Sequence, residues 1–194
     1  MRYKSTHKAE VGPKLLEAVG RGFRRAGFSG IGVDGLAKEA GVTSGAFYGH
    51  FESKDAAFSA AAVAGLDTLR EAIDHLQATY KDIWAATFID FYLSERLTCE
   101  LGESCGLQSM TPDVMRASDA TKAKYEQSLM NVANSVARGL IGNTKAKRLQ
   151  MAWGLLAILS GGVTLARSVE DEKTRQVIAD NLKRSALTMI GNTE

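Results

Sequence analysis

Apolar side chains recur at steps of three and four residues along most of the chain. This spacing is the period of an α-helix that turns one face toward a core. Leu15, Val19 and Phe23 form the first such stripe, and no run of alternating apolar and polar residues bounded by turns is present. The pattern therefore predicts an all-α protein. The first helix is expected over residues 10–26. Beyond residue 53, further helices are expected over residues 54–80, 82–93, 107–117, 119–141, 146–167 and 171–190.

The stretch GVDGLAKEAGVTSGAFYGHFESK (32–54) favours two short helices joined by a tight turn. Gly41 is expected to end the first helix, because glycine adopts the left-handed backbone angles of a helix terminus. Thr43 or Ser44 can cap the second helix, predicted over 44–50 and only about two turns long. Two helices at a steep angle with glycine in the turn are typical of a helix-turn-helix, whose second helix enters the DNA major groove.

The charge distribution changes the picture only at the amino-terminal end. The net charge is +2, but residues 1–55 hold nine Lys and Arg against six Asp and Glu, whereas residues 56–194 are close to neutral. The basic start MRYKSTHK (1–8) either approaches phosphates or is a solvated, frayed terminus. A hydrophobic content of 45% is enough for a core, and only two prolines occur, which favours long helices.

The amino-acid sequence of the helix-turn-helix stretch resembles the DNA-binding signature of the TetR/AcrR family of bacterial transcriptional regulators. The matching segments are GFRRAGFSGIGVDGLA (22–37), LAKEAGV (36–42), the small residues at 44–46, FYGHF (47–51) and SKDAAF (53–58). The resemblance covers about the first sixty residues strongly. The remainder matches the family in length and helical character.

This resemblance implies a fold of about nine helices in two parts. Residues 1–53 would form a three-helix helix-turn-helix domain, and residues 54–194 a helical domain for effector binding and dimerisation. The helix over 54–80 would carry ligand-driven motion between them. The last two helices would pair with their twofold mates, so that a homodimer binds a palindromic operator in double-stranded DNA.

The family positions also imply which residues meet DNA. Ser44 and Gly45 would face base edges, Ala46 would lie near the backbone, and Gly49 stands where many relatives have a bulkier contacting residue. Tyr48, His50 and Lys54 would contact phosphates. The full predicted set is Thr43, Ser44, Gly45, Ala46, Tyr48, Gly49, His50 and Lys54.

Simpler readings exist for several of these residues. Phe47 and Phe51 are expected in the core rather than stacked on DNA. Ser44 could be only a helix cap, and His50 could make only a local hydrogen bond. Asp34 is expected to stabilise the first turn of its helix rather than to contact DNA. Since Ser and Ala discriminate bases weakly, DNA shape and water should contribute to recognition.

Aromatic residues and methionines of the second part could line a cavity for an apolar or aromatic effector of unknown identity. The simpler reading is that most of them are packed core. The candidates are Trp84, Phe88, Phe91, Tyr92, Met110, Met115, Tyr125, Met130 and Trp153.

Both cysteines, Cys99 and Cys105, fall in a stretch predicted as a loop (96–106). They are either ordinary small residues or thiols that sense oxidants or electrophiles, although the neighbouring Glu100 and Glu103 disfavour a thiolate. Two cysteines without a nearby histidine make a poor metal site. No cofactor and no metal are expected.

The sequence therefore favours a ligand-responsive regulator, most simply a repressor, over two other classes. An enzyme has no visible anchor, because HExxH, Gly-x-Ser-x-Gly and Walker motifs are missing. A DNA-binding structural protein without an effector is the other alternative. No signal peptide and no apolar run of about 18 residues stand out, so a cytoplasmic location without a membrane span is expected.

Overall fold

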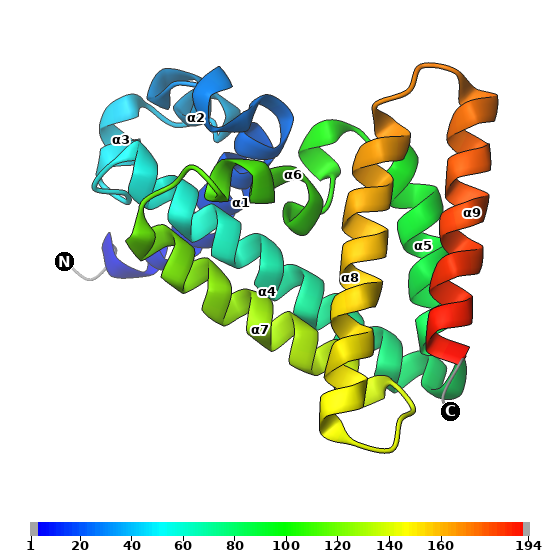
Figure 1. The fold of residues 1–194 in the computed structure, drawn as a ribbon. Helices are drawn as coiled ribbons and strands as arrows, with labels where there is room; N and C mark the ends of the chain where they lie inside the picture. Colours follow the sequence, from blue (N-terminus) through cyan, green and yellow to red (C-terminus); the bar gives the residue numbers. More distant parts are fainter. Residues whose placement is uncertain (1–3, 192–194) are drawn as a thin grey trace. The chain divides into compact units, whose positions relative to one another are not determined.

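The computed structural model describes residues 4–191, and the side chains from residue 12 onward. The described residues are helical and contain no strand, which confirms the predicted all-α class (Figure 1). Residues 1–3 and the side chains of 4–8, which make up the basic start, lie outside the described part. The elements are α1 (Lys4–Gly30), α2 (Val33–Glu39), α3 (Ser44–Tyr48), α4 (Lys54–Tyr80), η1 (Lys81–Ile83), α5 (Trp84–Thr98), η2 (Leu101–Glu103), α6 (Gly106–Val114), α7 (Asp119–Gly139), α8 (Lys145–Arg167) and α9 (Glu172–Gly191).

The helices form two compact units. Unit 1 consists of the residues up to Gly65 together with Glu100–Glu126, and unit 2 consists of Leu66–Cys99 and the residues from Gln127 onward. Helices α4 and α7 therefore each contribute one part to unit 1 and one part to unit 2. The expected boundary between a DNA-binding domain (1–53) and an effector-binding and dimerisation domain (54–194) concerns function rather than compactness, and it stays a prediction.

The core of unit 1 is built around α1. Leu15, Val19 and Phe23 are buried, as the stripe predicts. The helix begins at Lys4 rather than at residue 10, and its regular geometry is interrupted at Gly27 (φ 72°, ψ 170°), where the sequence predicts its end. A residue with a side chain would be strained at that positive φ. The interruption turns the following residue, Phe28, toward other aromatic rings.

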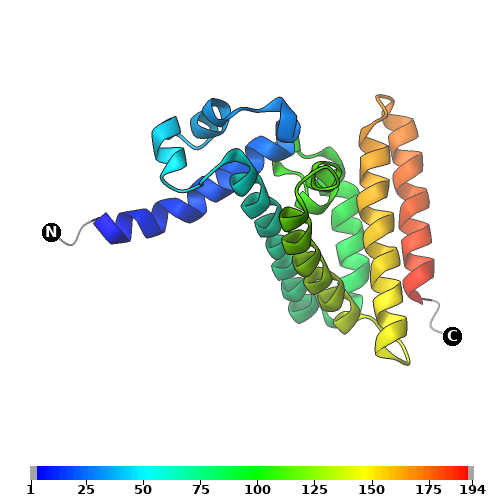
Figure 2. The ribbon, with the colours of Figure 1, turned by 60° about the vertical axis from the view of Figure 1, so that its left-hand side comes forward.

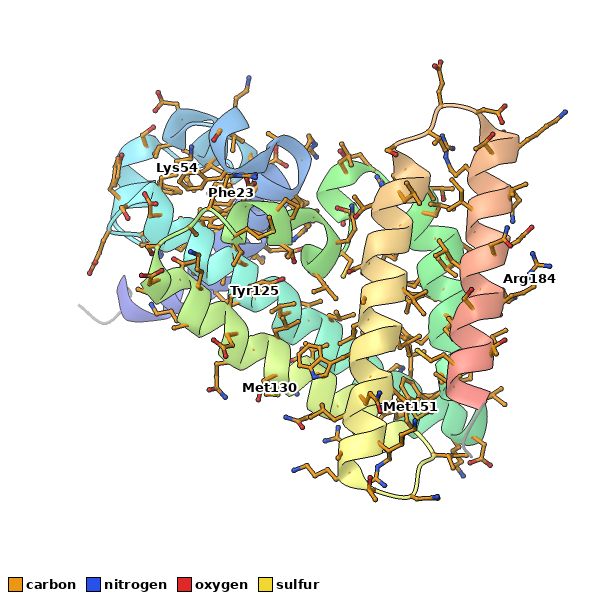
Figure 3. The ribbon with its side chains drawn as sticks, viewed as in Figure 1. Phe23, Lys54, Tyr125, Met130, Met151 and Arg184 are labelled. Carbon is orange, nitrogen blue, oxygen red and sulfur yellow. The ribbon has the colours of Figure 1, made fainter. Side chains whose placement is uncertain are left out.

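Three phenylalanine rings join α1 to α4 inside unit 1. The ring of Phe58 lies 5.2 Å from those of Phe23 and Phe28, edge-on in both pairs. Aromatic rings prefer such edge-to-face arrangements because ring edges and faces carry opposite partial charges. The Lys54 ammonium lies 4.4 Å from the centre of the Phe28 ring, and Figure 3 labels Lys54 and Phe23 in this region.

Residues 100–126 join unit 1 through polar contacts with α1. Arg24 Nε donates to the Gly102 carbonyl oxygen at 2.6 Å, and Arg25 Nε donates to Glu100 Oε1 at 2.8 Å. The backbone N–H of Phe28, just after the break in α1, donates to Asp113 Oδ2 at 2.7 Å. These contacts hold η2 and α6 against α1.

Several predicted boundaries were wrong in this part of the chain. The stretch predicted as a loop, 96–106, contains the last turn of α5 and the short helix η2. Helix α6 spans Gly106–Val114 instead of 107–117, and Pro112 lies near its end. The predicted helices over 54–80, 119–141, 146–167 and 171–190 are present within two residues of their expected ends.

Unit 2 is organised around α5 and α8. Trp84, Phe88 and Tyr92 lie four residues apart on α5 and are buried, with successive ring centres 6.3 Å and 5.6 Å apart. Helix α8 packs against both α5 and α9, and in Figure 2 α8 and α9 run side by side. Gly162 of α8 faces Leu182 of α9 so closely that an added Cβ would lie 2.5 Å from a leucine methyl carbon.

Helix α8 is the most apolar helix of unit 2. Its mean hydropathy reaches 1.5, and by length and composition alone it could cross a membrane, although no such span is expected from the sequence. About 44% of that stretch is buried within the protein. The helix begins at a Thr144 cap, whose Oγ1 accepts from the Lys147 N–H at 3.1 Å. A helix that is apolar around most of its surface has to be covered on several sides, and α5 and α9 cover part of this one.

Candidate nucleic-acid interface

Helices α2 and α3 form the predicted helix-turn-helix. Leu36 and Ala37 of α2 are buried, and Gly41 has the expected positive φ of 67°. Thr43 caps α3, because its Oγ1 accepts from the Ala46 N–H at 3.2 Å. Helix α3 has only five residues, Ser44–Tyr48, and is shorter than the predicted 44–50.

Phe47 anchors α3 to the core of unit 1. Its side chain is fully buried, and its ring centre lies 5.1 Å from Phe51 and 5.6 Å from Tyr48. The predicted core position of Phe47 is confirmed, while Phe51 is half-buried. A five-residue helix gains little from its own hydrogen bonds, so this side chain determines how α3 lies.

Five of the eight predicted DNA contacts are exposed, and the other three are half-buried. Tyr48 is 56% exposed, and the sites of Gly45 and Ala46 are open to solvent. The remaining members are distributed as follows: Thr43 and Gly49 are exposed, whereas Ser44, His50 and Lys54 are half-buried. The exposed members therefore surround α3, whereas Lys54 begins α4 and its ammonium lies over the Phe28 ring. Whether they touch DNA stays a prediction.

Sequence reasoning missed a contact between α2 and α3. Ser44 Oγ donates to Asp34 Oδ1 at 2.5 Å, although the two residues are ten positions apart. Since Thr43 is the cap, the Ser44 hydroxyl is not needed for capping. Only the three-dimensional course of the turn brings these two polar side chains together.

The arginines of α1 are engaged within unit 1. Arg25 pairs with Glu39 at 2.9 Å and with Glu100 at 2.8 Å, and the hydrogen bond to Glu100 is the largest cause that raises the Arg25 pKa. Arg21 lies 3.8 Å from Glu39 and 3.2 Å from Glu17. These side chains brace α2 and η2 rather than offering their charge to an outside partner.

The effector candidates are divided between the two units. In unit 2 Trp84, Phe88 and Tyr92 are buried, Phe91 and Trp153 are half-buried, and Met130 is 38% exposed. Figure 3 labels Met130 on α7. The set is therefore not one continuous wall within either unit, and its binding role stays a prediction.

The three remaining candidates, Met110, Met115 and Tyr125, lie in unit 1. Met110 and Tyr125 are buried, but Met115 is 67% exposed. The Tyr125 hydroxyl lies 2.7 Å from Thr111 Oγ1, and burial raises the pKa of this phenol to about 12. A buried, hydrogen-bonded tyrosine of this kind is explained by packing between α6 and α7.

A surface hollow of about 420 Å³ lies on α4 and α7 within unit 2, and no predicted effector residue lines it. Asp74 accepts from Arg138 at 2.6 Å and from Arg70 at 3.2 Å, and it also accepts from the Ser135 hydroxyl. Its lining residues are Asp67, Arg70, Asp74, Asn131, Asn134, Ser135 and Arg138. Because the arginines already pair with Asp74, the hollow offers no apolar site.

The two cysteines are free thiols and both are half-buried. Arg167 Nη1 lies 3.5 Å from Cys99 Sγ, and this guanidinium also donates to the Arg96 and Cys99 carbonyl oxygens at 2.8 Å. Arg167 thus closes the carboxyl end of α5. Within the described part of the chain, no three His, Cys, Asp or Glu side chains are grouped to hold a metal.

Comparison with known proteins supports this description of α1 to α3. Residues 15–61 match the family model of bacterial regulatory proteins, tetR family. The chain has the fold of the TetR-family transcriptional regulators. The predicted resemblance is confirmed, and with it the assignment of a DNA-binding helix-turn-helix. The search of curated protein sequences found no significant match.

Solved structures extend the likeness to nearly the whole chain. The reduced form of NemR from E. coli is similar with a TM-score of 0.74 at 17% identity, covering 90% of this chain and 96% of that one. A TetR-family regulator from Cytophaga hutchinsonii gives 0.70 at 18%, with 97% and 96% covered. One from Legionella pneumophila gives 0.72 at 14%, with 95% and 99% covered. At these identities the likeness concerns the TetR fold.

Proposed function

We propose that this TetR-like protein is a ligand-responsive transcriptional repressor that binds a palindromic operator as a homodimer. The observation that carries the proposal is the geometry of α3. Phe47 holds one side in the core, Thr43 caps the start, and Gly45, Ala46 and Tyr48 face solvent. Small side chains allow a backbone to approach the major groove closely, and exposed N–H groups at a helix start attract phosphate.

Dimerisation through α8 and α9 is part of the proposal. Each helix retains a large apolar side chain at its surface: Leu165 is 56% exposed and Val177 is 59% exposed. Gly161 of α8 has no neighbour within 4 Å of an added Cβ, so another helix can approach there. These faces support a helical interface with a second copy. TetR-family regulators are in general not enzymes, and we propose no catalytic role for any residue of this chain.

The test of operator binding starts with the full-length protein and a random DNA library at moderate salt. We expect a dimer by analytical ultracentrifugation and selection of a twofold-symmetric sequence. Lys54→Ala should weaken binding to all sequences and flatten the plot of log affinity against log salt by about one unit. Lys124→Ala, which removes an exposed charge of α7 outside the predicted contacts, is the matched control. A monomer, or DNA binding without any palindrome, would contradict the proposal.

The effector is proposed to be a small apolar or aromatic molecule. Buried aromatic residues of α5 such as Phe88 and Tyr92 supply the surface that such a ligand prefers. A thermal-shift screen with aromatic compounds tests this, provided that each stabilising compound is then measured for its effect on operator affinity. A compound that stabilises the protein and releases the operator supports regulation. Because the operator lies in bacterial DNA, the protein is proposed to act in the cytoplasm.

A thiol-based trigger at Cys99 is the second candidate for the signal. The guanidinium of Arg167 lies 3.5 Å from Cys99 Sγ, and a thiolate is the nucleophilic form of cysteine. With a peroxide, the sulfur would attack one oxygen and form sulfenic acid while the O–O bond breaks and the other oxygen leaves as water. Among the described residues no basic side chain contacts the Cys105 thiol, which makes Cys105 the less suitable of the two.

Mass spectrometry after mild peroxide treatment separates this candidate from an ordinary cysteine. Modification of Cys99 at doses that release the operator, lost in Cys99→Ser, would support it. Operator release without modification of Cys99, or modification without release, would reject it. Cys105→Ser is the matched control.

A further inference from the structure

Asp34 lies at the start of α2 beside the first residue of α3. Its carboxylate is exposed and accepts the hydroxyl hydrogen of Ser44 at 2.5 Å. No Lys, Arg or His of the described residues forms an ion pair with Asp34. An unneutralised carboxylate therefore stands directly next to the residues proposed to read the operator.

The hydrogen-bonding capacity of this pair is one-sided. A carboxylate can only accept hydrogen bonds, and the single hydroxyl hydrogen of Ser44 is already donated to it. Thr43 has its own role as the cap of α3 and does not compete for Asp34. Toward an outside partner, the two side chains of Asp34 and Ser44 present acceptor lone pairs.

Because Asp34 and Ser44 offer only hydrogen-bond acceptors, they can pair only with a base edge that carries a donor. In the major groove guanine shows two acceptors and thymine shows one, whereas cytosine and adenine each show an amino donor. Adenine places its N7 acceptor beside that donor, where it would meet the second carboxylate oxygen. Cytosine has no such acceptor on its own major-groove edge, so its amino group fits a carboxylate best.

We propose that Asp34, oriented by Ser44, is a specificity-determining residue that accepts a hydrogen bond from a cytosine amino group in each half-site of the operator. This inference deepens the proposed operator binding by α3 and rests on it. It also assigns Asp34 a role beyond the helix-stabilising one expected from its first-turn position. The same charge repels phosphates and thereby lowers affinity for non-operator DNA.

The Asn variant separates base reading from a structural role. In Asp34→Asn the remaining carbonyl oxygen still accepts from Ser44, so the link between α2 and α3 is kept. The new amide can both donate and accept, which is the pattern that pairs with adenine N7 and N6. A purely structural Asp34 would leave every base preference unchanged in this variant.

The experiment compares operators selected by the full-length wild type, Asp34→Asn, Asp34→Ala and Ser44→Ala from one random DNA library. For the wild type we expect cytosine at one symmetric position, with a loss of about 10- to 100-fold when that base is replaced. Asp34→Asn should shift that position to adenine, and Asp34→Ala should remove the preference and raise affinity for random DNA. Ser44→Ala should weaken the preference at the same position. Asp119→Asn, a fully exposed carboxylate of α7, is the charge-matched control and should change no base preference.

The results distinguish failure of operator binding from failure of base reading by Asp34. If the wild type selects no palindrome, the proposed operator binding fails. If it selects one and both Asp34 variants retain its base preference at every position, the reading by Asp34 is overturned while operator binding stands. A changed preference at one symmetric position in Asp34→Asn supports the inference, even if Asp34→Ala does not fold.

Discussion

Replacing Asp113 by alanine tests the link between α6 and α1 most directly. The Asp113 carboxylate, whose side chain is 17% exposed, accepts from the Phe28 N–H at 2.7 Å and from Arg116 Nη2 at 2.9 Å. A hydrogen bond to a charged group contributes about 1.5–3 kcal/mol, and its loss leaves a partly buried N–H without an acceptor. The exposed pair with Arg116 adds only a few tenths, roughly 0.3 kcal/mol. We therefore expect the contact between α6 and the end of α1 to weaken by about 2–3 kcal/mol.

Amide hydrogen exchange under native conditions measures this contact at its own position. In Asp113→Ala the protection of the Phe28 amide should fall about 30-fold or more, since 1.4 kcal/mol corresponds to a factor of ten. Asp113→Asn keeps an acceptor without the charge and should show a smaller loss. Asp119→Ala, whose carboxylate is fully exposed and pairs only with Lys122 at 3.6 Å, is the control. Unchanged exchange at Phe28 in Asp113→Ala would refute the reasoning.

Three further substitutions have expected outcomes. Phe47→Ala should destabilise the domain by about 3–5 kcal/mol and abolish operator binding, measured by urea unfolding and DNA titration; retained binding would contradict the anchoring role. Because the pKa of Tyr125 is raised in the folded protein, its protonated phenol stabilises the fold below pH 10, and this stabilisation is lost as pH rises toward 12. Between these pH values, the wild type should therefore lose about 2–3 kcal/mol more stability than Tyr125→Phe, measured by urea unfolding. Parallel stability curves for the two proteins would contradict this expectation. Gly162→Leu should lower the melting temperature, because even an added Cβ would lie 2.5 Å from Leu182. An unaltered melting temperature would show that α9 shifts at little cost.

The elements that could be predicted from sequence are those with local signals. The turn between α2 and α3 depends on the positive φ of Gly41 and the cap at Thr43, and both are written in a few consecutive residues. The buried position of Phe47 follows from the same short segment. These features need no knowledge of distant parts of the chain. The turn at Gly41 and the burial of Phe47 were predicted correctly, and the cap was predicted as either Thr43 or Ser44.

The parts that could not be predicted depend on contacts between distant residues. Arg24 and Arg25 meet Gly102 and Glu100 more than seventy positions away, and these contacts order a stretch whose composition is typical of a loop. The pairing of Asp34 with Ser44 likewise requires the turn to be folded. Aromatic residues that pack in a core and those that line a binding site have the same sequence pattern. The sequence therefore could not show which of the effector candidates are buried and which are exposed.

The bracing of α1 has a consequence for how the protein would find its operator. Arg21 and Arg25 pair with acidic side chains of unit 1, so in the described part of the chain their charges add little to the attraction of a DNA backbone. Weak attraction to arbitrary sequences shortens each stay on chromosomal DNA and makes sliding brief. The search would then proceed by many short visits, with recognition left to the few residues around α3.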